Sequence, residues 1–366
     1  KAGTEKAIIR EMTKLCPNKL LQILIIGAVF PSFLQGITGF GVPVAVGAPL
    51  LIGIGIKPIW AVIVPLLGQA WGGTFGTLAV AWDALIAQTQ SGLNNEQILK
   101  TAFFAGIFIW IFNFICYTAI CWFYGKWKGL RKGLPAIIII SAIQGGGQLL
   151  AGQINQTLAC FLPSCISMMA LILLGKTGLY NTVWEIKNSQ MVISSGKNDG
   201  KEYVKEKMSI HQAFLPYYFL TVLTMVILLI KPLKDRLNSV KVGFSFPEMV
   251  TGYGFVDKAV GKYSPIAPFT HAGIFLLLSA LVGLFYYRKK GFMTKADQID
   301  VIKGTLKRTL RTGLVIVEFI VMSRVMSGTG QTMVLAYGIS SVLKKFYILL
   351  SPFIGMLGSF MTSSTM

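Results

Sequence analysis

The sequence predicts an all-α polytopic membrane protein with inverted repeats, re-entrant hairpins and a discontinuous helix. Of its 366 residues, 54% are hydrophobic and only 13% are charged, whereas an average soluble domain is about one quarter charged. A chain with so few charges cannot cover a water-exposed surface. Uncharged stretches long enough to cross a bilayer, which takes about 20 residues, recur along the chain. Clusters of glycine and hydroxyl residues interrupt several of these stretches, which predicts broken helices among the plain spans.

The composition also excludes other classes of protein. Disordered chains have low hydrophobicity, which this chain does not, and five cysteines over this length are too few for a disulfide scaffold. The net charge of +20 would suggest nucleic-acid binding in a soluble protein. Here the basic residues lie between apolar runs, as they do beside membrane spans. We therefore expect the lipid bilayer as a partner and no nucleic acid.

Loop charges place the chain relative to the membrane. Segments 1–19, 126–132 and 288–311 are rich in Lys and Arg, whereas 83–100 holds only two acidic residues and one basic residue. The positive-inside rule puts the first three segments in the cytoplasm and the fourth outside.

These positions require an even number of crossings between residues 19 and 126. Spans 58–82 and 101–125 supply two, so residues 20–56 must add either none or two. Two full spans would be tight, because Gly36, Thr38, Gly39 and Gly41 interrupt the middle. A re-entrant hairpin fits better, because broken backbone at membrane depth is tolerated only where it is enclosed by protein or lines a cavity. The hairpin would comprise an arm 20–35, a tip 36–41 and a return arm 42–56.

The sequence divides into three predicted regions. Residues 1–132 form a first repeat, which opens with an amphipathic surface helix over 1–19. Residues 133–309 hold central spans, with polar loops at 176–207 and 231–262. Residues 310–366 start a second repeat of opposite sidedness, truncated in its hairpin, so we expect the sequence to be an internal piece of a longer protein. The predicted elements of the last two regions are two spans within 133–175, spans 208–230, 263–287 and 310–328, an amphipathic stretch 331–345, a hairpin arm 346–358 and a polar tip 359–366.

Three polar clusters at apolar depth are the candidate substrate-binding sites. Glycine clusters free backbone N–H and C=O groups, which can hold a carboxylate or a cation, and hydroxyls add further ligands. The run GQAWGGTFG at 68–76 also predicts a break within its span. The alternative at each place is ordinary helix packing by small residues, with Trp71 facing lipid in the second cluster. The candidate residues are Gln35, Gly36, Thr38, Gly39, Phe40, Gly41, Gln69, Thr74, Thr362, Ser363, Ser364 and Thr365.

Two charges lie inside an apparent span, at Glu318 and Arg324. Intramembrane charges are costly and often functional, so both are candidates for ion coupling, although Arg324 could instead snorkel to the interface. They stand six residues apart and are poor partners for each other. The sequence contains no nucleophile set, metal motif or phosphate loop, so we expect no enzyme, no metal site and no cofactor.

Two segments resemble the signature regions of the L-lactate permease family. From Pro17 to about residue 82 the chain carries PSFLQGITGFGVPVAVGAPLLIGIGIK and GQAWGGTFG, and it ends in FIGMLGSFMTSSTM, where Ser363 replaces the more usual glycine. The resemblance implies uptake of lactate and related 2-hydroxymonocarboxylates such as glycolate, usually with protons. It also implies a location in the bacterial plasma membrane and elevator-type access, with substrate held between the tips 36–41 and 362–365.

Three functions stay open on the sequence alone. The first is a proton symporter for a small monocarboxylate, and the second is a Na⁺-coupled carboxylate carrier of the same architecture. The third is a membrane scaffold without transport. A homodimer is one expected assembly.

Overall fold

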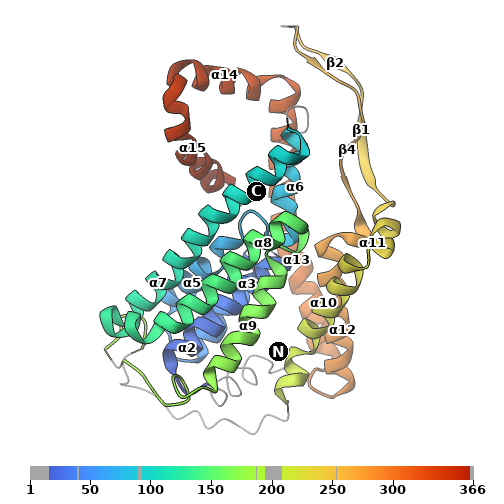
Figure 1. The fold of residues 1–366 in the computed structure, drawn as a ribbon. Helices are drawn as coiled ribbons and strands as arrows, with labels where there is room; N and C mark the ends of the chain where they lie inside the picture. Colours follow the sequence, from blue (N-terminus) through green and yellow to red (C-terminus); the bar gives the residue numbers. More distant parts are fainter. Residues whose placement is uncertain are drawn as a thin grey trace. The chain divides into compact units, whose positions relative to one another are not determined.

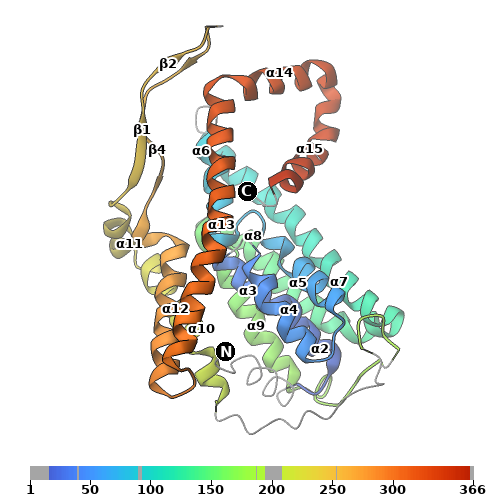
Figure 2. The same ribbon diagram turned by 180° about the vertical axis from the view of Figure 1, so that it is seen from behind.

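A computed structural model describes residues 16–38, 41–89, 93–186, 188–193, 208–252 and 254–362 (Figures 1 and 2). Contacts divide the chain into two compact units, and the boundary falls between Leu215 and Pro216. Each unit is described by itself. The predicted surface helix 1–19 lies almost wholly outside the described residues. The division of the chain into inverted repeats stays a prediction.

The first unit is built around one enclosed rod. Asn18 begins it by accepting a hydrogen bond from the backbone N–H of the third residue after it. The rod runs through α2 (Lys19–Leu24), the π-helical segment η1 (Ile25–Val29) and α3 (Phe30–Ile37). Pro31 lacks the N–H for a helical bond, and the wider π turn lies immediately before it. Its apolar window is entirely buried by the rest of the protein, so the rod is the core of this unit.

The chain then folds back beside the rod. Gly41 takes a left-handed conformation, with φ of 78°, and begins α4 (Val42–Gly53). A Cβ added at Gly47 would lie 3.0 Å from Pro31, so the two arms pack closely. At the open end, the ammonium of Lys19 donates to the carbonyl of Ile54. The arms therefore form a helical hairpin over 19–37 and 42–53, close to the predicted boundaries.

A broken helix follows the hairpin. Helix α5 (Pro58–Gln69) passes through a 3₁₀ turn, η2 (Ala70–Gly72), into α6 (Gly76–Thr89). The two helices are bent by 50° at the break, where the sequence predicts an interruption.

The next element, α7 (Asn95–Ser141), is two helices joined by a reversal. Gly125 and Lys126 leave helical geometry, and beyond them the second arm runs back along the first: a Cβ at Gly106 would meet Leu149. The predicted cytoplasmic loop 126–132 is thus wrong in length, because only two residues leave the helix. Lys and Arg are good helix formers, so the basic cluster continues the second arm.

The second arm continues into three further elements. They are a π-helical segment η3 (Ala142–Gly146), α8 (Gly147–Ile154) and, after the turn η4 (Gln156–Leu158), α9 (Phe161–Gly175). The prediction of two spans within 133–175 agrees with this order, with the glycines inside the first of them. Figure 1 shows α7, α8 and α9 side by side.

The polar segment after α9 closes the open end of the hairpin. Backbone N–H groups of Lys19 and Lys57 donate to the carbonyls of Trp184 and Met191, at 3.0 and 2.8 Å. The nearby thiol of Cys16 is buried, and this burial raises its pKa to about 11.

This unit exposes large apolar side chains, and its mostly apolar interior also holds uncharged polar groups. Phe104 and Phe108 on α7 and Met169 on α9 are 58%, 70% and 65% exposed. In contrast, every buried polar side chain that the structure describes is uncharged. By length and composition, three described helices could cross a membrane, or up to five if each bent pair is one span. Exposed apolar faces of this kind are what a lipid environment stabilises.

The second unit contains helices and a β-ribbon. Its elements are the part of α10 (Ile210–Leu229) from Pro216 onward, α11 (Lys231–Asn238), β1 (Val242–Phe246), β2 (Met249–Val250), β3 (Val256–Asp257), β4 (Val260–Ile266), η5 (Pro268–Thr270), α12 (Ala272–Lys289), α13 (Lys295–Gly328), α14 (Gln331–Leu343), η6 (Lys344–Phe346) and α15 (Tyr347–Thr362). Strand β1 pairs antiparallel with β4, and β2 with β3. In Figure 2, α14 joins the ends of α13 and α15.

Several predicted boundaries in this unit need correction. The loop 231–262 contains a helix and paired strands, which are enriched in Val and Phe as strands are. The span predicted at 263–287 begins as a helix only at Ala272, because β4 occupies its first residues. Helix α13 starts at Lys295, well before the predicted span 310–328, and α15 continues helically to Thr362, into the predicted tip.

Candidate functional site

The first turn of α6, directly after the break, is locally strained. Thr77, Leu78 and Ala79 have φ of 52°, 57° and 63°, a left-handed conformation that costs roughly 1–2 kcal/mol per non-glycine residue. The sense of the helix reverses at this turn, although the Ala79 N–H still donates to the Phe75 carbonyl at 3.3 Å. Such strain persists only where the surroundings enforce it.

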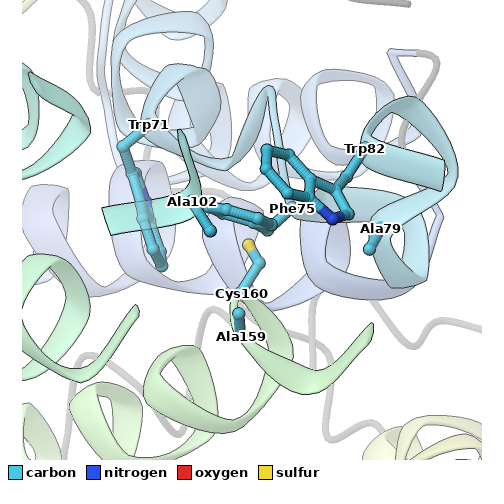
Figure 3. Packing of buried hydrophobic residues seen from close by; sticks show 7 residues of the cluster. All are labelled: Trp71, Phe75, Ala79, Trp82, Ala102, Ala159 and Cys160. Carbon is cyan, nitrogen blue, oxygen red and sulfur yellow. The ribbon is translucent and has the colours of Figure 1, made fainter. Parts of the chain in front are cut away.

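Aromatic packing supplies that enforcement (Figure 3). Trp71, Phe75 and Trp82 extend from the broken helix into a buried cluster with Ala102 of α7 and Cys160 beside α9. The ring centroids of Phe75 and Trp82 are 5.1 Å apart. Trp71 is only 1% exposed, so the alternative in which it faces lipid is wrong.

The hairpin and the break meet at Gln35. A Cβ on Gly72 would lie 2.9 Å from Cγ of Gln35, and one on Gly76 would lie 3.0 Å from its Nε2 and its backbone oxygen. Only glycine permits this approach. Two clusters that the sequence singled out separately are therefore in contact, with the buried Gln35 side chain over the break.

Ser32, one turn earlier on α3, ties the hairpin to the broken helix. Its hydroxyl is 2.8 Å from the carbonyl of Ala28 and 2.7 Å from that of Gly68. The hydroxyl oxygen accepts from the indole N–H of Trp71 at 3.0 Å and lies 3.3 Å from the hydroxyl of Tyr117. All of these groups are buried, which strengthens the bonds and makes each loss costly.

The network continues into α7, η3 and α9. The Gln144 carbonyl oxygen accepts from Tyr117 at 2.8 Å and from Nδ2 of Asn113 at 3.0 Å, and its Nε2 donates to Ser167 at 2.9 Å. Sequence reasoning missed this network. The available signal was the pair of glutamines, Gln144 and Gln148, that flanks three glycines inside an otherwise apolar span.

The predicted hairpin tip is described only in part. Gly36 is helical, and a Cβ there would lie 2.8 Å from Cα of Phe161, so its present role is close helix packing. The Thr38 hydroxyl donates to Leu34 at 2.8 Å. Gly41 is exposed with open space around it. Gly39 and Phe40 lie outside the described residues, so substrate binding at the tip stays a prediction.

The remaining candidates have different surroundings. Gln69 ends α5, and its Oε1 is buried without a hydrogen-bond partner. Thr74 is half-buried in the break. Thr362 is the last residue of α15, and Ser363, Ser364 and Thr365 lie outside the described residues.

The two coupling candidates on α13, Glu318 and Arg324, have different surroundings. Arg324 donates to Asp257 of β3 at 2.6 Å, with side chains 14% and 17% exposed, and its guanidinium lies 4.9 Å from the ring centre of Phe246. The structure thus gives Arg324 a partner on the β-ribbon. Glu318 is exposed on the same helix. Arg324 thus pairs with Asp257 and not with Glu318, as the six-residue spacing predicts.

The exposed apolar faces, the uncharged interior and the apolar helices define a helical membrane protein. The whole chain, residues 1–366, matches the L-lactate permease family, and the protein belongs to that family. It is a multi-pass plasma-membrane protein and not an enzyme.

Curated relatives match along nearly the full chain. It is 25% identical to an L-lactate permease of Halalkalibacterium halodurans, over 95% of this chain and 62% of the relative. It is 27% identical to glycolate permease GlcA and 26% identical to an L-lactate permease, both of Escherichia coli, over 99% and 100% of this chain. The chain covers 66% of each of these two, so it spans less than two thirds of the relatives' length. No solved structure matches it.

Proposed function

We propose that the protein takes up L-lactate, glycolate or a related 2-hydroxymonocarboxylate across the plasma membrane by secondary active transport. Family membership supports the proposal, as do relatives named for both substrates. The observation that carries it is the contact between Gln35 of the hairpin and the glycines of the broken helix. Irregular backbone enclosed within a helical membrane protein is the usual setting of a transport site. Because the chain spans less than two thirds of these relatives' length, transport is proposed for the protein as a whole.

The break offers the chemistry that a small carboxylate needs. Regular helical bonding stops after the 3₁₀ turn, which the Gly73 N–H closes by donating to the Ala70 carbonyl at 3.2 Å, and we expect backbone N–H groups beyond this turn to meet the substrate. N–H donors and hydroxyls hold a carboxylate without a full positive charge. Gln35 and Gln69 add carboxamides on either side. This arrangement would bind the anion weakly enough for its release on the other side of the membrane.

Alternating access would use the two hairpins of an inverted repeat. We place the first tip, 36–41, on one side of the substrate and the second, Thr362–Thr365, on the other, with both hairpins re-entering the membrane. The observed hairpin over 19–37 and 42–53 supports the first half of this arrangement. Movement of one hairpin-bearing bundle against the other would then expose the site to each side in turn.

Proton symport is our first proposal for coupling, and Na⁺ symport is the second candidate. The second is favoured by one observation: the described buried oxygens belong to uncharged carboxamides and hydroxyls, and oxygen ligands suit hard cations. Family membership speaks against the scaffold alternative. A homodimer stays a prediction.

Uptake of labelled L-lactate into cells or vesicles that contain the full-length protein tests these proposals. We expect saturable uptake that excess glycolate inhibits, that an inward proton gradient stimulates and that survives replacement of Na⁺ by choline. Loss of uptake in choline would select Na⁺ coupling. Absence of uptake for every 2-hydroxy acid tried, with the protein present in the membrane, would refute the transport proposal.

A further inference from the structure

Several buried polar atoms near the broken helix have no hydrogen-bond partner. The Gln148 carboxamide is fully buried, and both its Nε2 and its Oε1 are unpaired; Oδ1 of Asn113, Oε1 of Gln69 and Oγ of Ser141 are unpaired as well. An unsatisfied buried polar group costs about 1–3 kcal/mol. Native proteins rarely keep such groups without a ligand or an ordered water.

Gln148 and Asn113 lie in one region, which Gln144 connects. Gln144, one turn before Gln148, is bonded to Asn113 and to Tyr117, which lies beside Ser32. Ala151, almost one turn after Gln148, packs on the cluster that contains Trp71 and Phe75. The face of the helix that carries Gln148 is therefore turned toward the broken helix.

Small residues keep the neighbouring face of α8 close to the same region. A Cβ at Gly152 would be 3.8 Å from the Phe75 ring, and one at Gly147 would be 3.0 Å from Pro163 of α9. Gln148 is thus enclosed by protein, and its unpaired carboxamide has little access to bulk water.

The unpaired atoms match a 2-hydroxymonocarboxylate. The carboxylate of such a substrate needs N–H donors, which the Gln148 amide nitrogen supplies, and its hydroxyl needs an acceptor, which Asn113 supplies. We propose that Gln148 binds the substrate carboxylate and that Asn113 accepts the bond from the 2-hydroxyl, forming a selectivity position beside the break. This inference rests on the proposed transport function and names residues that the sequence did not single out.

The apolar variant Gln148→Met, which has a similar size, tests the proposal by two measurements: it should preserve stability but weaken substrate binding. Because Gln148 makes no hydrogen bond in the structure, its replacement removes an unpaired polar group, so the substrate-free protein should unfold at the same temperature or higher. The KM for L-lactate should rise by about 10-fold or more, as expected for loss of a hydrogen bond to a charged group. L-lactate should also lose its ability to raise the unfolding temperature of the purified full-length protein.

Gln22→Met is the matched control. Gln22 is a buried carboxamide whose Nε2 donates to the carbonyl of Cys16 at 2.7 Å, so its replacement should lower stability while leaving the KM for L-lactate unchanged. A second variant, Asn113→Leu, should reduce the preference for L-lactate over propionate, which lacks the 2-hydroxyl.

The outcomes separate this inference from the proposed function. If wild-type protein binds and transports L-lactate and Gln148→Met has the same KM, the inference is overturned and a bridging water occupies the position. The same holds if Gln148→Met lowers stability without a change in KM. If the wild-type protein neither binds nor transports any 2-hydroxy acid, the proposed function itself fails.

Discussion

Removal of the Ser32 hydroxyl should destabilise the protein through the groups that bond to it. In Ser32→Ala the indole N–H of Trp71 loses its acceptor at 3.0 Å and stays buried. An unpaired buried donor costs about 1–3 kcal/mol. The Ser32 hydroxyl has one proton, so it donates to only one of the carbonyls of Ala28 and Gly68 at a time, and that bond is lost as well, whereas the Tyr117 hydroxyl keeps its bond to Gln144 at 2.8 Å. The expected loss therefore combines the indole N–H with one carbonyl bond.

A double-mutant cycle isolates the contribution of the indole. Trp71→Phe removes the donor, so Ser32→Ala should cost less in that background than in the wild type. Hydrogen bonds inside membrane proteins give coupling energies that average about 0.6 kcal/mol and reach about 1.7, and the present one should fall in the upper half because both partners are buried. The assay is unfolding of purified protein in detergent, by denaturant or heat. Additive effects of the two substitutions would show that the bond does not hold the hairpin to the broken helix.

Three further predictions concern packing, charge and titration. Gly68→Ala should destabilise by at least about 1–3 kcal/mol, because its Cβ would lie 2.4 Å from backbone Cα of the first hairpin arm; thermal unfolding measures this loss. Asp257→Asn should cost about 1–3 kcal/mol in the same assay, since it replaces the charged partner of the partly buried Arg324 by a neutral acceptor. Burial raises the pKa of Cys16 to about 11 in the folded protein, whereas the thiol has a pKa of about 9 when unfolded. The stability that the buried neutral thiol contributes should therefore fall as pH rises from about 9 to 11. The free energy of unfolding should fall more over this range in the wild type than in Cys16→Ala.

Two matched variants serve as controls for these predictions. Gly152→Ala introduces a Cβ at an ordinary contact distance of 3.8 Å and should be neutral or slightly stabilising, because alanine favours the helix. Glu96→Gln breaks an exposed pair with Lys100, at 73% and 67% exposure, and should cost less than about 1 kcal/mol. Equal losses in test and control would contradict the packing and charge arguments.

Local signals in the sequence predicted the features that depend on local backbone. The hairpin arms and the break follow from glycine, which permits the left-handed Gly41 and the close approach at Gly72, and from uncharged runs of the right length. The substrate-binding role of both tips stays a prediction.

Features that depend on residues far apart in the chain could not be predicted from the sequence. The bond between Asn113 and Gln144 joins two arms of a helix pair, and no spacing rule reports which faces of two apolar helices meet. The partner of Arg324 was missed for a similar reason, since Asp257 lies 67 positions earlier on a strand. The two-residue reversal at Gly125 and Lys126 was hidden because basic residues suit a loop and a helix end equally.

The enclosed rod over 19–37 constrains how the protein is assembled. This segment is apolar enough to enter a bilayer alone, yet in the finished protein α4, α5, α7 and α9 pack against its parts and its apolar window is fully covered. The ribosome produces it before any of those helices. The rod is thus synthesised before the helices that cover it, and lipid or the insertion machinery must hold it until α9 has been synthesised.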